Sequence, residues 1–136
     1  MKRTALLNRH LSALIATLGH GDCIVVADAG LPAPPGVPVI DLAVTAGVPR
    51  FDQVLQAIRA ELVIEGIVWA QEASADLTRD LTAACDGWAA DQGRPIARST
   101  LTHEAFKEST ASARAIIRTG EVTPYANVIL ISGVAF

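Results

Sequence analysis

Hydrophobic residues recur every three or four positions in three stretches of the chain, which is the spacing of helices that bury one face, and a capping residue predicts a fourth helix. In the first stretch, Asn8 is placed to cap the start of the helix and Gly19 to close its end. The third stretch stops at Gly93, and the fourth helix follows Thr102, whose hydroxyl suits an N-cap. The predicted helices cover about 8–18, 51–62, 77–92 and 103–112, and the apolar stripes of the first three are Leu7, Leu11, Leu14, Ile15 and Leu18; Phe51, Val54, Leu55, Ile58 and Leu62; and Leu77, Leu81, Ala84, Cys85 and Trp88.

Short apolar runs alternate with these helices and predict strands. Residues 23–27 form an unbroken apolar run between turn residues, which is typical of a strand covered on both faces. Similar segments lie at 39–42, 62–70, 96–101, 116–118 and 127–131. The segment 62–70 is interrupted at Glu65 and Gly66. The alternation predicts an α/β fold, with a single compact domain over 1–136 and a central, mostly parallel sheet flanked by helices.

Composition adds an expectation of self-association. The chain has 136 residues, of which 51% are hydrophobic and only 18% charged, more apolar surface than a small monomer needs to bury. We therefore expect part of it to be buried against copies of the same chain. The net charge of -3 and the scattered Lys and Arg residues argue against nucleic acid as a partner.

Targeting and membrane signals are missing from the pattern. No apolar run reaches the roughly 18 to 20 residues that cross a bilayer. The apolar segment after Met1 is too short and too regular for a secretory signal. We expect a cytoplasmic protein that makes no use of a membrane.

Signatures of cofactor and metal chemistry are also missing. The chain has no Gly-x-Ser-x-Gly elbow, no phosphate-binding loop and no His-Glu-x-x-His. Gly19 and Gly21 precede a strand instead of following it, so they do not make a dinucleotide fingerprint. Cys23 and Cys85 are interpreted as apolar fillers. A metal site from His20, Asp22, Asp28 and His103 has no supporting ligand spacing, and we expect neither a cofactor nor a metal.

The stretch 18–32 carries two side chains that could take part in catalysis, and its glycines leave room for a ligand to reach the first of them. His20 lies between two glycines just past the first helix, whose carboxyl end favours a protonated imidazole unless burial opposes it. Asp28 follows the strand 23–27, so His20 and Asp28 flank one strand. The loop 29–38 after it holds four prolines and is of the rigid kind that often carries sites. The simpler interpretations are a polar helix end for His20 and a turn-forming residue for Asp28.

Other polar residues lie at predicted element ends and complete an acid/base inventory. His103 opens the last helix, where an ordinary helical role is the alternative. Tyr125 and Asn127 follow Pro124, and they could simply end a hairpin. Because His and Asp move protons while Tyr and Asn hold hydroxyls, the set suits acid/base chemistry on an uncharged polyol.

At these residues the chain resembles the D-ribose pyranase and L-fucose mutarotase family. The resemblance runs nearly end to end, and Tyr125-Ala-Asn127 and the turn after Asp28 are more similar to the ribose enzymes than to the fucose enzymes. The segment 70–98 departs most from the family pattern, and neither Trp69 just before it nor Trp88 within it belongs to that pattern. The motifs that carry the resemblance are Leu18-Gly-His-Gly-Asp22, Val26-Ala-Asp-Ala-Gly-Leu-Pro32, Gly47-Val-Pro49, Thr102-His-Glu104, Ile117-Arg-Thr-Gly-Glu121 and Pro124-Tyr-Ala-Asn127.

The resemblance implies an isomerase that interconverts ring forms of a free monosaccharide without a cofactor, most simply β-D-ribopyranose and β-D-ribofuranose. It implies that His20 is the catalytic acid, and that the sugar is bound by Asp28, His103, Tyr125, Ala126 and Asn127. It also implies a ring-forming subunit, in decamers of two stacked pentamers. The alternatives are a mutarotase for L-fucose or another sugar, a sugar-binding accessory protein without catalytic activity, and a purely structural ring.

Overall fold

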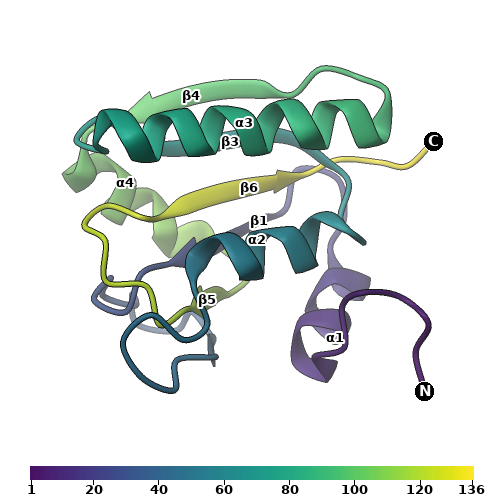
Figure 1. The fold of residues 1–136 in the computed structure, drawn as a ribbon, viewed down its shortest axis with the longest axis horizontal. Coiled ribbons are helices and arrows are strands. Elements are labelled where there is room, and N and C mark those ends of the chain that lie inside the picture. The colour runs from purple at the N-terminus through teal and green to yellow at the C-terminus, as the bar shows by residue number, and fades with distance from the viewer.

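Five strands of the central sheet run in one direction, and a sixth runs against them. The computed structural model describes residues 1–136, and the sheet has the order β2-β5-β1-β6-β3-β4 (Figure 1). β6 alone is antiparallel to its neighbours, β1 and β3, while the other three pairings are parallel. The strands are β1 (Cys23–Ala27), β2 (Val39–Asp41), β3 (Ile64–Ala70), β4 (Ala97–Leu101), β5 (Ile116–Arg118) and β6 (Val128–Ser132).

The predicted strands all form, with boundaries that move by one or two residues. The run 23–27 is confirmed residue for residue as β1. The interruption predicted at Glu65 and Gly66 is a β-bulge, where the pairing of β3 with β6 shifts register. The hairpin considered around Tyr125 and Asn127 is wrong, because β1 lies between β5 and β6 and those two strands do not pair.

The four predicted helices are also present. They are α1 (Arg9–Thr17), α2 (Phe51–Arg59), α3 (Ala75–Gln92) and α4 (His103–Ser109), the last continuing as a 3-10 turn over Thr110–Ser112. The Asn8 side chain accepts hydrogen bonds from the first turn of α1, and Thr102 caps α4 in the same way. α1 ends at Thr17, and its C-cap is Leu18, one residue before the predicted Gly19. Leu7 was placed wrongly on the buried stripe, since it lies before the helix and is 65% exposed.

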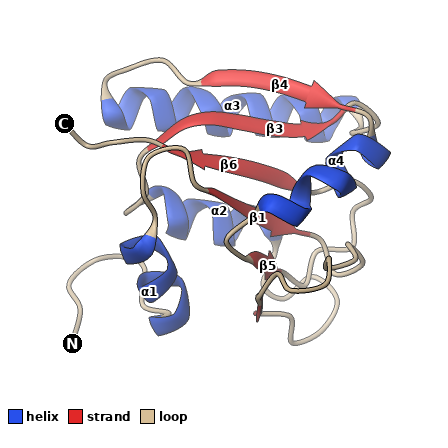
Figure 2. Cartoon of the chain, turned by 180° about the vertical axis from the view of Figure 1, so that it is seen from behind, coloured by secondary structure: helices blue, strands red, loops and turns tan.

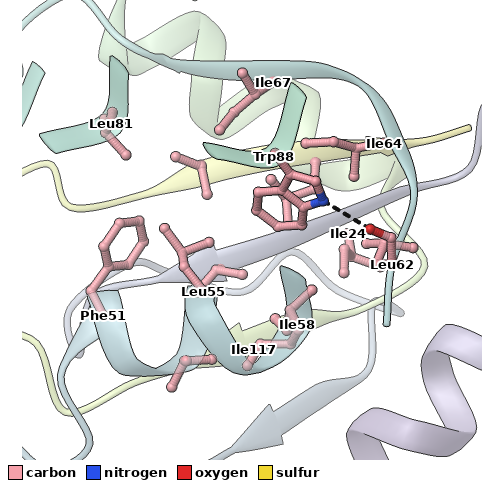
Figure 3. Close-up of a cluster of buried hydrophobic side chains, with 14 of the residues drawn as sticks. Ile24, Phe51, Leu55, Ile58, Leu62, Ile64, Ile67, Leu81, Trp88 and Ile117 are labelled. Atoms are coloured by element: carbon pink, nitrogen blue, oxygen red, sulfur yellow. Dashed lines mark hydrogen bonds between the residues drawn. The ribbon is translucent and has the colours of Figure 1, made fainter. Parts of the chain in front are cut away.

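Helices α2 and α3 cover one face of the sheet, and α1 packs onto the same core (Figure 1). This core holds 21 buried residues, among them Phe51, Leu55 and Ile58 of α2 around Trp88 of α3 (Figure 3). The Trp88 indole N–H donates to the Leu62 carbonyl oxygen at 2.8 Å. The segment 70–98 therefore supplies a long core helix, and its tryptophan is a packing residue.

The opposite face is only partly covered. Helix α4 lies across it at one end (Figure 2), where Phe106 packs with five other buried residues. Cys23 and Val68, which pack against this cluster, stay half-buried, as does Ile131 of β6, and strand β4 at the sheet edge is exposed along Ala97–Thr100. Neither cysteine forms a disulfide. No helix is long and apolar enough to cross a bilayer.

Candidate active site

Asp28 and Asn127 are joined side chain to side chain and side chain to backbone. Asn127 Nδ2 donates to Asp28 Oδ2 at 2.8 Å, and the Asp28 N–H donates to Asn127 Oδ1 at 2.8 Å. The second carboxylate oxygen accepts from the Gly30 N–H at 2.9 Å. The pairing follows from the sheet, because Asp28 comes after β1 and Asn127 comes before its antiparallel neighbour β6. Each Asp28 oxygen retains lone-pair capacity, so the carboxylate is fixed in place and still able to accept hydroxyl groups.

His103 and Tyr125 meet at the same end of the sheet. Their ring centroids lie 5.0 Å apart with the rings nearly perpendicular, an edge-to-face arrangement. Tyr125 has a φ of 64°, a left-handed conformation that is uncommon for a bulky residue and often marks a functional position. The His103 N–H donates to both oxygens of Glu72, and His103 Nδ1 is buried without a hydrogen-bond partner.

The loop that carries Tyr125 and Asn127 is anchored by Glu121. One oxygen of this carboxylate accepts from the N–H and hydroxyl of Thr123 at 3.0 and 2.8 Å, and the other accepts from the Phe51 N–H at 3.3 Å. Its carbonyl oxygen accepts from the Ala29 N–H at 2.8 Å. Burial alone raises the pKa of Glu121, but hydrogen bonds from Thr123, Phe51 and Val122 together hold that pKa below its usual value. Glu121 thus ties both loops of the cluster to the start of α2.

Arg118 performs the same task for the loop after β1. Its Nε donates to the Ala29 carbonyl oxygen at 2.9 Å, while its Nη1 contacts both oxygens of Asp41 at 3.2 and 3.0 Å. Ala29 directly follows Asp28, so the guanidinium fixes the backbone beside the candidate carboxylate. Ala126, by contrast, is only 1% exposed, so it contributes to the cluster through its backbone and through packing of its buried side chain.

His20 lies at the opposite end of the sheet from this cluster. It stands in the turn before β1, is 62% exposed, and places Nε2 2.7 Å from Glu65 Oε2 at the start of β3. The turn is closed by Asp22, which accepts from the Gly19 N–H at 2.8 Å and from Arg114 Nε at 3.0 Å. The hydrogen bond from Arg114, joined by that from Gly19, holds the pKa of Asp22 below its usual value.

The length of β1 sets the separation of the two groups. At about 3.3 Å per residue, the stretch from Asp22 to Asp28 spans roughly 20 Å. The structure therefore brings together Asp28, His103, Tyr125, Ala126 and Asn127, and it leaves His20 apart from them within one chain. The metal set considered from the sequence is divided in the same way, with His20 and Asp22 at one end and Asp28 and His103 at the other.

A separate groove of about 770 Å³ runs between α2 and α3. Phe51, Leu81 and Trp88 contribute to its apolar floor, with Arg50 and several acidic residues around it. Of the six candidate residues only Ala126 lines it, so this groove lies beside the cluster and does not contain it.

Four residues around the candidates had no assigned role in the sequence: Glu65 and Glu72, which contact His20 and His103, and Arg118 and Glu121, which contact the neighbouring loops. Arg118 and Glu121 fall inside a motif that carries the family resemblance. Glu65 is a charged residue inside an otherwise apolar strand, which is a usable signal. Glu72 left no signal, because its contact with His103 joins segments 31 residues apart.

Comparison with known proteins gives a consistent result over the whole chain. Residues 1–135 match the RbsD / FucU transport protein family. The D-ribose pyranase of Paracidovorax citrulli is 54% identical over 136 residues, covering 100% of both chains. The structure of Bacillus subtilis RbsD complexed with D-ribose matches with a TM-score of 0.86 and 41% identity over 100% of both chains. A fucose mutarotase in complex with L-fucose from Streptococcus pneumoniae matches with a TM-score of 0.78 and 26% identity over 98% of this chain and 99% of that one.

Proposed function

The chain belongs to the RbsD / FucU transport protein family, and from this membership we infer that it is a D-ribose pyranase. The activity is an isomerisation of free D-ribose between its β-pyranose and β-furanose rings. The observation that carries this conclusion is the 54% identity, without loss of coverage, to a D-ribose pyranase. Ribose is favoured over fucose because the match to RbsD with D-ribose exceeds that to the fucose mutarotase in both identity and TM-score. Residues 1–136 then act as one pyranase/mutarotase-like domain in the cytoplasm.

The chemistry needs proton transfers and no redox step. Ring opening delivers a proton to the ring oxygen as its bond to the anomeric carbon breaks, and removes a proton from the anomeric hydroxyl. Reclosure through a different hydroxyl reverses both transfers. A positioned acid or base typically contributes about 10² to 10⁴-fold to such a step. His20 is the proposed proton donor, since its imidazole is exposed and flanked by glycines that leave room for a sugar.

The cluster at the other end of the sheet is the proposed sugar-binding surface. Asp28 accepts sugar hydroxyls through an already oriented carboxylate, and Asn127 holds that carboxylate in place. Tyr125 offers a ring face and a hydroxyl, while His103 offers its second ring nitrogen. Ala126 contributes its backbone and the close packing beneath the sugar.

His20 and the Asp28 cluster can form one site only if a second copy of the chain takes part. His20 stands in the turn before Asp22, and the stretch from Asp22 to Asp28 spans roughly 20 Å, so His20 is too far away to reach a sugar that Asp28 of the same chain holds. We propose that His20 of one subunit completes the sugar site of its neighbour in a ring, as a decamer of two stacked pentamers. The half-covered sheet face around Val68 and Ile131 and the exposed edge strand β4 supply surface for such contacts.

Saturation-transfer NMR on D-ribose tests the activity. Irradiating the β-pyranose anomeric signal should transfer saturation to the β-furanose signal faster with enzyme than without it, and His20→Ala should remove the acceleration. L-Fucose serves as the comparison sugar. Faster α/β exchange on fucose with none on ribose would reassign the chain to the sister activity, and calorimetric binding of ribose with an unchanged exchange rate would identify an accessory protein.

A further inference from the structure

Glu65 occupies an irregular place in strand β3. The ladder between β3 and β6 pairs Ile64 with Ser132 and Gly66 with Ile131, so Glu65 is the extra residue of a β-bulge. A bulge re-aims the side chain it carries, and bulges are common beside active sites. Gly133 lies against the Glu65 backbone closely enough that an added Cβ would stand 3.3 Å from its nitrogen. The backbone that directs this carboxylate is therefore fixed by the fold.

The Glu65 carboxylate contacts His20, and the turn that carries His20 is held by contacts that do not involve Glu65. Glu65 Oε2 lies 2.7 Å from His20 Nε2. The turn bearing His20 is tied to the sheet by Asp22 and by the hydrogen bond from the Gly21 N–H to the Ser132 carbonyl at 2.8 Å. Ser132 also pairs with Ile64, the residue before Glu65. Both partners are thus positioned from the same end of β6.

We propose that Glu65 is the positioning residue for His20, and that it engages Nε2 so that Nδ1 is the nitrogen that exchanges protons with the sugar. The part that concerns the sugar rests on the proposed function. A carboxylate that binds one ring nitrogen fixes both the orientation of the imidazole and which nitrogen carries a proton when the ring is neutral. The second nitrogen, Nδ1, is then left for the ligand.

The proton balance follows from this arrangement. In the imidazolium, Nε2–H donates to Glu65 and Nδ1–H donates to the ring oxygen of the sugar. The Nδ1 proton moves to that oxygen, which also takes the electron pair of its breaking bond to the anomeric carbon, while the anomeric hydroxyl releases its proton to water. On reclosure the attacking hydroxyl returns a proton to Nδ1, and water protonates the carbonyl oxygen. Glu65 neither gives nor takes a proton in these steps.

Solid-state NMR on sedimented protein carrying ¹⁵N,¹³C-histidine and ¹³C-glutamate tests the pair without reference to activity. The chain has only three histidines, so His20 can be assigned by comparison with His20→Ala. We expect a downfield Nε2–H proton and a through-space contact from Nε2 to the Glu65 carboxyl carbon. Both should vanish in Glu65→Ala and persist in weakened form in Glu65→Gln, which keeps an acceptor oxygen. A downfield proton on Nδ1, or His20 signals unchanged by Glu65→Ala, would overturn the proposal.

The exchange assay supplies the second arm. Glu65→Ala should lower the ribose exchange rate at saturating sugar by roughly three- to tenfold with KM unchanged, and Glu65→Gln should recover part of the loss. Ribose affinity measured by calorimetry should be the same in Glu65→Ala and in the wild type, because a positioning residue acts only through the His20 that transfers the proton. Glu108→Ala, which removes an exposed carboxylate from α4, is the matched control.

The two arms separate the two claims. A loss of ribose affinity or of folding stability in Glu65→Ala as large as its loss of exchange rate would show a merely structural role and overturn the proposal. A wild-type protein that does not accelerate ribose exchange would overturn the proposed function, while the spectroscopic arm would still decide whether Glu65 engages Nε2.

Discussion

Asn127 and Asp28 exchange two hydrogen bonds of 2.8 Å across 99 residues of sequence. The amide donates to the carboxylate, and the backbone N–H of Asp28 donates back to the amide oxygen. Asn127 is completely buried, whereas Asp28 is partly open to solvent. In this pair Asn127 is therefore the buried, structural residue, and Asp28 is the residue that a ligand can reach.

Exchanging the two side chains separates these halves. Asn127→Asp alone places two carboxylates together and should lower the unfolding free energy by about 1–3 kcal/mol, since a buried donor is lost and like charges face each other. The double variant Asp28→Asn, Asn127→Asp restores the hydrogen bond between the two side chains with donor and acceptor reversed, and it keeps an acceptor oxygen for the backbone N–H groups of residues 28 and 30. Urea unfolding should show most of the stability regained, while ribose exchange stays slow because the carboxylate is now buried. A double variant no more stable than Asn127→Asp would contradict the pairing.

Tyr125 is predicted to tolerate loss of its hydroxyl better than a change of shape. Tyr125→Phe keeps the ring against His103 and should leave the melting temperature unchanged, while weakening ribose binding roughly three- to tenfold through the lost hydrogen bond. Tyr125→Val puts a β-branched residue at a φ of 64° and should destabilise by about 1–2 kcal/mol. Thermal unfolding at fixed protomer concentration compares the variants. Equal stability of the two would contradict the left-handed backbone at this position.

Glu121 should make stability depend on pH in the acid range. Because hydrogen bonds lower the folded-state pKa of this carboxyl below its usual 4.5, its contribution is fully present above that value and is lost as pH falls through the folded pKa. Glu121→Gln lacks this ionisation, and its amide nitrogen faces the Phe51 N–H in place of an acceptor. Its deficit relative to wild type in thermal unfolding should be clear at neutral pH and shrink with acidification. If the stability deficit of Glu121→Gln grew toward low pH, the predicted pH dependence would be contradicted.

Trp88 should matter for stability alone. Trp88→Phe removes the hydrogen bond to Leu62 and leaves a small cavity between α2 and α3 (Figure 3), so we expect a loss of about 1–3 kcal/mol of unfolding free energy. The exchange rate per folded subunit should be unchanged, because the indole donates to the Leu62 carbonyl and takes part in none of the hydrogen bonds that hold Asp28. A fall in exchange rate without a fall in stability would show that α3 shapes the sugar site.

The periodicity of the sequence was sufficient to predict the helices and strands, but it could not predict the order of the strands in the sheet. An unbroken apolar run marked β1 to the residue, and the Asn8 and Thr102 caps placed two helix starts. The position of β6 between β1 and β3 depends on long-range pairings, which no local pattern encodes. The contact between Asp28 and Asn127 depends on that one placement, so the family resemblance could group the two residues while the pattern alone could not.

The same reasoning explains the position of His20. The sequence already indicated that His20 and Asp28 flank one strand, and a strand of five residues holds its two ends apart. The cluster of Asp28 and Asn127 gathers at the far end of β1, so one chain separates the proposed proton donor from the proposed sugar-binding residues. The proposed role of Glu65 depends on the β-bulge, and in the sequence this bulge is visible only as an interruption of the apolar run.

The most direct test of the central claim, a ribose site shared by two subunits, is complementation between two inactive variants. His20→Ala and Asp28→Ala are co-expressed with different tags, purified over both, and assayed by saturation transfer on ribose. Each variant alone should be inactive, and random mixed rings should recover about a quarter of the wild-type exchange rate, because one interface in four pairs an intact His20 with an intact Asp28. Mixed assemblies that contain both chains and remain inactive would contradict the shared site.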